Sequence, residues 1–190
     1  MAEMGLMFQW SLPQAMANAD TVMASADLPA APGEVIAALV TSEVERWWGS
    51  PDTYRLTGWS ADLRVGGSWS VTVETADGRR RPAGGEFLEI EMPHRIVQTR
   101  RYDWDHPALG RHETTVAYLL EPIAAGTRLT ICHGGFAGFP DAAAEQADGW
   151  ARVLGWLQEY FCARANQRWP EPLEHLFLRN SGRKTVTHFS

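Results

Sequence analysis

The amino-acid sequence predicts an α+β fold, in which a curved antiparallel sheet of about seven strands wraps around a long C-terminal helix. Two patterns support this prediction. Residues 54–135 alternate between apolar and polar side chains, with turn signals at regular intervals, as consecutive antiparallel strands do. Residues 141–165 carry an apolar stripe at helical spacing. Because the inner face of the sheet is the only large apolar surface left to cover, we expect the helix to pack across it.

The segment before this sheet is predicted to contain one strand and two short helices. Residues 20–28 have the pattern of a strand, and prolines and a glycine break the chain after them. Glu34 suits the first turn of the first short helix, because a carboxylate stabilises the positive end of the helix dipole. Ser42 can cap the second short helix, which contains the Trp47-Trp48 pair.

Six further strands are expected, with short turns between them. Gly66-Gly67 and Asp77-Gly78 are two of the turn signals, and the arginines at 79–81 are predicted to lie at a solvated loop tip. Strands that follow one another through short turns form an antiparallel meander. The predicted strands are residues 56–63, 68–74, 85–91, 96–102, 113–120 and 127–133.

The chain divides into three segments. Residues 1–19 show no sustained period and are predicted to form an N-terminal arm or short helix on the outside. Residues 20–165 make up the single domain. Residues 166–190 are an apolar C-terminal extension, which we expect to pack on the domain or on a partner subunit. The apolar surface of the arm and the extension is compatible with a homodimer.

Composition argues against several classes of function. The net charge of −6 does not suit a nucleic-acid partner, which needs a basic face. No apolar stretch approaches the roughly 18 residues that a membrane helix requires, and the first residues lack the basic start of a signal peptide. The two cysteines do not make a disulfide framework. We therefore expect a soluble cytoplasmic protein, with no membrane and no nucleic acid among its partners.

The order of the elements resembles the helix-grip superfamily (START-like, TBP-like, also called SRPBCC). Local segments over about residues 20–165 are similar to the subfamily named for the C-terminal domain of the Hsp90 ATPase activator. This resemblance implies the grip fold and a hollow between sheet and helix. The chain departs from the family at Gln98 and Arg100, where the family often has an aromatic residue. The similar segments are DLPAAPGEVIAALV at 27–40, DLRVGGSWSVTV at 62–73, GEFLEIEMPHRIVQTRRY at 85–102, GTRLTICHGGF at 126–136 and GWARVLGWL at 149–157.

Nine tryptophans are the most unusual feature of the composition. Six of them lie on elements that bound the expected hollow, and a tryptophan offers a large apolar ring with one N–H group, which suits a pocket for a ring-containing ligand. They could equally fill the core. The candidate ligand-binding residues are Trp47, Trp48, Trp59, Trp69, Val71, Arg100, Tyr102, Tyr118, Ile131, His133, Trp150, Leu154 and Leu157.

His133, Tyr118 and Arg100 are the candidate catalytic residues. His133 and Tyr118 could act as acid and base on a ligand, or His133 could be a hydrogen-bonded core residue that ties the last strand to the helix. Arg100 could hold a carboxylate at a polar end of the pocket, or it could pair across strands with Glu86 or Glu113.

Metal and cofactor chemistry have little basis in the sequence. Asp103, Asp105 and His106 could hold a cation, but a turn explains them more simply. Cys132 and Cys162 have no evident activating partner, so inert thiols are favoured. The sequence lacks the HExxH, CxxC, GxSxG, P-loop and GxGxxG motifs. We expect neither a metal nor a cofactor.

These observations favour the binding of a small hydrophobic ligand, aromatic or lipid-like, in the cavity between sheet and helix. Two alternatives follow from the resemblance. Related grip-fold domains include polyketide cyclases and aromatases, which would use the same cavity with an acid–base pair. A co-chaperone of Hsp90 is the third possibility, although the chain lacks room for the separate N-terminal domain that such activators use.

Overall fold

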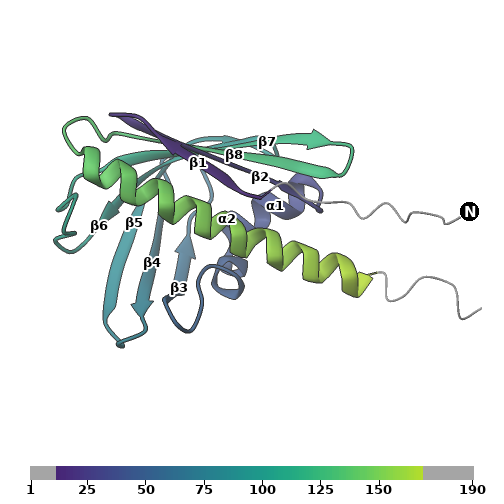
Figure 1. Ribbon diagram of the computed structural model, residues 1–190, viewed down its shortest axis with the longest axis horizontal. Helices are drawn as coiled ribbons and strands as arrows, with labels where there is room; N and C mark the ends of the chain where they lie inside the picture. The colour runs from purple at the N-terminus through teal and green to yellow at the C-terminus, as the bar shows by residue number, and fades with distance from the viewer. Residues whose placement is uncertain (1–11, 169–190) are drawn as a thin grey trace, which may run out of the picture.

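The computed structural model describes residues 12–168, in which one long helix crosses the concave face of a bent sheet (Figure 1). Within these residues eight antiparallel strands lie in the order β1-β2-β8-β7-β6-β5-β4-β3. Helix α2 (Pro140–Arg168) covers the sheet, while α1 (Pro32–Val40) and η1 (Ser42–Arg46) connect β2 to β3. The strands are β1 (Gln14–Ala17), β2 (Thr21–Leu28), β3 (Tyr54–Ala61), β4 (Ser68–Thr75), β5 (Arg80–Glu91), β6 (Arg95–Tyr102), β7 (Thr114–Ile123) and β8 (Gly126–Gly134).

The predicted helix-grip fold is confirmed, with one strand more than expected. Residues 14–17, which the sequence placed in the arm, form the edge strand β1 and pair with β2. The Asn18 side chain closes the turn between them, because its Oδ1 accepts the backbone N–H groups of Asp20 and Thr21 at 3.0 and 2.8 Å. An alanine-rich strand of four residues has too little alternation to be recognised. Residues 1–11 and 169–190 of the predicted arm and extension lie outside the described residues.

Strand β5 begins at Arg80, five residues before the predicted start at residue 85. Its first half contains a proline and two glycines, which are residues that usually mark turns. The Asp77-Gly78 turn is present, with Gly78 at φ 79°, but pairing with β4 resumes at Arg80 rather than at residue 85. Gly85 is required where it stands. A Cβ there would lie 2.0 Å from the carbonyl oxygen of Thr99 and 2.8 Å from Trp69 Nε1. Gly84 and Gly85 therefore allow β5 to pass close to the neighbouring strands.

The core lies between the concave face of the sheet and α2. The predicted stripe of the helix is buried, with Trp150, Leu154, Leu157 and Phe161 at most 2% exposed. Burying each such side chain contributes about 1.5–3 kcal/mol. The inner side chains of β8, among them Ile131, are also buried, as the alternation predicted. None of the helices within residues 12–168 has the length and apolar character needed to span a bilayer.

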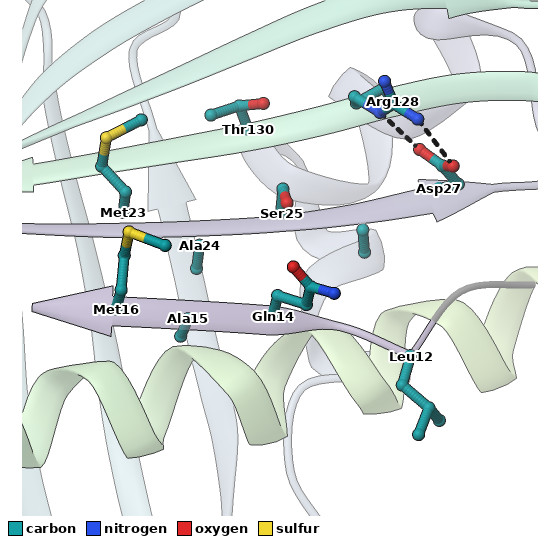
Figure 2. A pocket seen from close by; sticks show the side chains of 11 residues that line it. Leu12, Gln14, Ala15, Met16, Met23, Ala24, Ser25, Asp27, Arg128 and Thr130 are labelled. Carbon is teal, nitrogen blue, oxygen red and sulfur yellow. Dashed lines mark hydrogen bonds and ion pairs between the residues drawn. The ribbon is translucent and has the colours of Figure 1, made fainter.

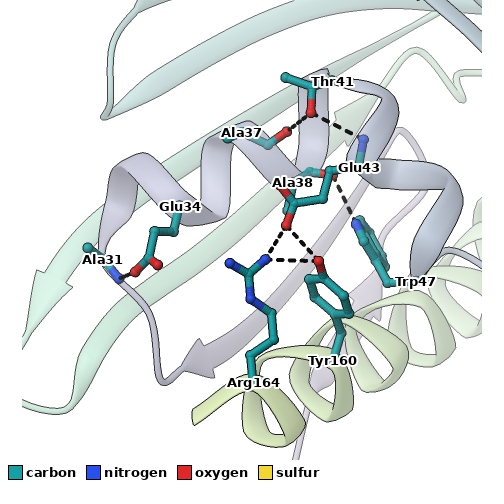
Figure 3. Close-up of polar contacts among 9 residues, drawn as sticks. All are labelled: Ala31, Glu34, Ala37, Ala38, Thr41, Glu43, Trp47, Tyr160 and Arg164. Atoms are coloured by element: carbon teal, nitrogen blue, oxygen red, sulfur yellow. Dashed lines mark hydrogen bonds and ion pairs between the residues drawn. The ribbon is translucent and has the colours of Figure 1, made fainter. Parts of the chain in front are cut away.

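The C-terminal half of α2 is tied to η1 by a polar cluster (Figure 3). The Tyr160 hydroxyl donates to Glu43 Oε1 at 2.7 Å, and Arg164 pairs with the same carboxylate. Arg164 also donates to the Tyr160 hydroxyl at 2.9 Å. Behind this cluster, Trp47 Nε1 donates to the carbonyl oxygen of Ala38 at 2.9 Å, which joins η1 to α1. These contacts hold the C-terminal half of α2 against η1.

Candidate ligand-binding site

A pocket of about 210 Å³ lies between the N-terminal half of α2 and strands β3 to β6. Aromatic rings form much of its wall, and several arginines line it. Four of the sequence-predicted site residues meet here, namely Trp48, Arg100, Tyr102 and Trp150. The lining residues are Trp48, Tyr54, Leu56, Val73, Thr75, Arg81, Arg100, Tyr102, Trp104, His106, Glu145, Gln146, Gly149, Trp150, Arg152 and Val153.

Arg100 is the most unusual of these residues. Its side chain projects from the inner face of β6 into the pocket. The guanidinium carbon lies 5.9, 5.7 and 5.9 Å from the ring centres of Trp48, Tyr102 and Trp150. Its Nε is buried and has no hydrogen-bond partner among residues 12–168. The expected alternative, a cross-strand pair with Glu86 or Glu113, is wrong. Both glutamates are exposed, and no ion pair of the described residues involves Arg100.

Three tyrosines surround Arg100 and do not neutralise its charge. Burial raises the pKa of Tyr118 to about 12, although the nearby Arg100 opposes this shift. Burial likewise raises the pKa of Tyr54, against a hydrogen bond from Trp48 and the charge of Arg100. The third tyrosine, Tyr102, accepts a hydrogen bond from Gln146 Nε2 at 3.3 Å. Phenols with raised pKa values stay protonated at neutral pH, so Tyr54 and Tyr118 place no negative charge beside the guanidinium.

His133 lies deeper, beside the pocket, and both of its ring nitrogens are bonded. Trp150 Nε1 lies 2.9 Å from Nδ1 and can only donate, so Nδ1 accepts and Nε2 carries the proton. Nε2 then donates to Thr114 Oγ1 at 2.8 Å, and that hydroxyl donates to the carbonyl oxygen of Arg100 at 3.1 Å. Burial, and then the charge of Arg100, lowers the pKa of His133 to about 3. This is the geometry of a neutral core histidine that joins β8 to α2.

The remaining candidate residues do not line the pocket. Trp59 and Trp69 stack on each other with ring centres 5.6 Å apart, and Trp69 Nε1 donates to the carbonyl oxygen of Thr99 at 3.1 Å. Trp47 belongs to the contact between η1 and α1 described above. The others are buried in the core under α2, and these are Val71, Tyr118, Ile131, Leu154 and Leu157.

The loop after β6 contributes Trp104 and His106 to the pocket. The sequence predicted a turn in this segment, with a cation site as the alternative. Asp103 and Asp105 point to different arginines, Arg101 and Arg111, at 3.4 and 3.1 Å. His106 instead stacks on Tyr102, with ring centres 4.5 Å apart. The ring of Trp104 packs beside both of them, with ring centres 5.4 Å from Tyr102 and 5.1 Å from His106, and lies under the Arg81 guanidinium at 4.2 Å. The aromatic spacing in this loop was the available signal.

The two cysteines lie away from the pocket. Cys132 and Cys162 are free and half-buried. Burial, assisted by the charge of Glu159, raises the pKa of the Cys162 thiol, which does not favour a reactive thiolate.

A larger hollow of about 400 Å³ lies on β1, β2 and β8 (Figure 2). Met16 and Met23 project from neighbouring strands, 68% and 46% exposed. At its far end Arg128 forms a bidentate pair with Asp27, with nitrogen–oxygen distances of 2.8 and 3.0 Å. Its charged groups are thus already matched. The pocket under α2 combines aromatic walls with an unmatched charge, and we take it as the candidate site.

The fold and this pocket define the class of protein: a helix-grip domain with a small aromatic pocket under the helix. The chain belongs to the family described as activator of Hsp90 ATPase homolog 1-like protein, whose model matches residues 29–162. Among curated proteins, none matches the sequence.

Solved structures share this fold. A Rhodobacter sphaeroides protein has a TM-score of 0.68 at 23% identity, covering 80% of this chain and 98% of its own. A Chromobacterium violaceum protein has a TM-score of 0.64 at 26% identity, covering 74% and 96%. An activator-like protein of the same family from Aeromonas hydrophila has a TM-score of 0.61 at 20% identity, covering 76% and 94%. At these identities the likeness establishes the fold.

Proposed function

We propose that the protein binds a small hydrophobic ligand, containing an aromatic ring, in the pocket under α2. The observation that carries this proposal is the pocket itself, whose walls include the rings of Trp48, Tyr54, Tyr102 and Trp150. Its volume of about 210 Å³ exceeds the roughly 150 Å³ of an apolar cavity that holds benzene. A guest of one or two fused rings fits such a space.

The arrangement of the rings also supports an aromatic guest. Trp48 and Trp150 meet edge to face, with centres 5.6 Å apart at 63°, so the pocket offers both a ring face and a ring edge. Aromatic pairs prefer offset or edge-to-face contact, which adds about 0.5–1.5 kcal/mol to the burial of area. The indole N–H groups are already directed elsewhere, to His133 from Trp150 and to the Tyr54 hydroxyl from Trp48 at 3.4 Å. The two indoles therefore present apolar surface to a guest.

Two glycines of α2 provide a matched test. Gly149 lines the pocket and Gly155 does not, and nothing lies within 4 Å of the position that a Cβ would take at either. Gly149→Met should fill the pocket, whereas Gly155→Met should leave it open. Both should stabilise the helix by up to about 1 kcal/mol, because glycine is a poor helix former. A loss of binding in Gly149→Met alone would then reflect the occupied space.

Binding is measured by quenching of tryptophan fluorescence and by the rise in melting temperature with naphthalene-based compounds. A ligand at 100 times its Kd stabilises the folded state by about 2.7 kcal/mol. We expect this effect in the wild type and in Gly155→Met, and its absence in Gly149→Met. If no one- or two-ring compound binds the wild type, or if Gly149→Met binds as the wild type does, the proposal fails.

The other two functions have weaker support. A cyclase- or aromatase-like reaction was expected to use His133 as acid or base, but both of its nitrogens are bonded and it lies outside the pocket. A co-chaperone role rests on the family description alone.

A further inference from the structure

We infer that the ligand is an aromatic carboxylate, whose anionic group binds Arg100. This inference rests on the proposed function and specifies the chemical class of the ligand. It starts from charge. The protein carries a net charge of −6, yet the pocket is lined by Arg81, Arg100 and Arg152 against the single acidic residue Glu145, a formal charge of 3 − 1 = +2.

Among residues 12–168 no carboxylate pairs with Arg100, whose side chain shares a hydrogen bond only with a phenol, that of Tyr102. Its guanidinium lies near the 6 Å limit at which aromatic rings attract a cation, so the three rings around it compensate only weakly. Glu145, the acidic residue of the lining, lies on the outer rim, where its carboxylate is 58% exposed and 3.9 Å from His106 Nε2. Arg100 is half-buried and lines the pocket, and its Nε is buried without a partner. Burying part of a guanidinium without an anion is costly, and a bound carboxylate would reduce that cost.

Arginine suits a carboxylate better than it suits a neutral polar group. Its planar fork presents parallel N–H groups that match the two oxygens of a carboxylate, and such charge-assisted bonds are about twice as strong as neutral ones. Trp48 and Trp150 lie on the wall beside the guanidinium. A ligand with its ring against these indoles therefore places a carboxylate attached to that ring towards Arg100. The expected class is a one- or two-ring aryl carboxylate.

The test compares 2-naphthoate with 2-naphthamide, which has the same ring and nearly the same shape but no charge. We expect the wild type to bind the carboxylate at least tenfold more tightly, by isothermal titration calorimetry at neutral pH. Arg100→Met should lose this preference and keep the affinity for the amide. Arg100→Lys, which retains the charge without the fork, should show an intermediate preference.

Arg101→Met is the matched control. Arg101 is the next residue of β6, but it faces outward, 58% exposed, and pairs with Asp103. Its loss removes one positive charge from the same strand, so an unchanged preference in this variant shows that position rather than net charge matters.

The outcomes separate the two proposals. If the wild type binds both compounds equally, or the amide more tightly, the carboxylate inference is wrong while ligand binding stands. If Arg101→Met and Arg100→Met reduce the preference equally, the assignment to Arg100 is wrong. If neither compound nor any other one- or two-ring compound binds the wild type, both proposals fall. The ratio in the wild type decides the ligand class even if a variant does not fold.

Discussion

Acidification should destabilise the protein through His133, because the histidine is held neutral in the folded state. Burial, and then the charge of Arg100, lowers its pKa from 6.5 to about 3. Below pH 6.5 the unfolded chain therefore binds a proton that the folded chain does not. The stability from this group is present above 6.5 and is lost as the pH falls towards 3. The difference between these two pKa values lowers the free energy of unfolding by about 2 kcal/mol between pH 7 and pH 5.

The contribution of one histidine is isolated by comparing two proteins. The free energy of unfolding in urea is measured at pH 7 and pH 5 for the wild type and for His133→Gln, which can still accept from Trp150 but does not titrate. Other groups affect both proteins alike, so the variant should lose about 2 kcal/mol less than the wild type. In addition, the ring resonances of His133 in the folded wild type should not move between pH 8 and pH 5. Equal losses in the two proteins, or a folded-state titration near pH 6.5, would refute the reasoning.

Two further substitutions test the buried polar groups near the pocket. Thr114→Val removes the hydroxyl between His133 and the Arg100 carbonyl, which should cost about 1–3 kcal/mol, whereas Thr115→Val, on the exposed face of the same strand, should change stability by less than about 0.5 kcal/mol. If the two substitutions lower the free energy of unfolding in urea equally, the hydrogen bonds of Thr114 to His133 and to the Arg100 carbonyl do not contribute as described. Gln98 is 3% exposed, and its Oε1 has no partner among residues 12–168. Gln98→Met should therefore leave the melting temperature unchanged or raise it, with a gain in the free energy of unfolding of up to about 1 kcal/mol. A clear fall in melting temperature would show that the amide oxygen is bonded.

Most of the fold could be predicted from the sequence because periodicity reports burial directly. Apolar residues recur every two residues in the meander and every three to four residues in α2. These periods follow from the geometry of a strand and of a helix, so they hold whatever the tertiary contacts are. Two features were missed for physical reasons. Strand β1 (Gln14–Ala17) is too short and too rich in alanine to alternate, and the first half of β5 contains residues that usually mark turns. In that half of β5, the close packing of Gly85 against the backbone of Thr99 outweighs the preference of proline and glycine for turns.

The site was only partly predictable. Trp48, Arg100, Tyr102 and Trp150 could be named because each lies on an element that borders the space under the helix. Tyr54 could not, since it begins a strand where the pattern is weakest. The aromatic residues of the loop after β6 were a usable signal, but the same segment also has the pattern of a turn. The role of His133 depends on which atoms meet its two nitrogens. Sequence spacing carries no information about that, so its alternatives stayed open until the partners were known.

The hydrogen-bonded chain through His133 has a consequence for how selective the pocket can be. Trp150 on the helix is joined to the histidine, the histidine to Thr114, and Thr114 to the backbone of Arg100. The indole of Trp150 and the backbone of β6 at Arg100 are thus linked through the interior by three bonds, and helix α2 and strand β6 cannot separate there without breaking one. A rigid gap of this kind favours guests of matching thickness, because little ordering remains to be done when they enter. Discrimination by size would therefore originate in residues that no guest touches.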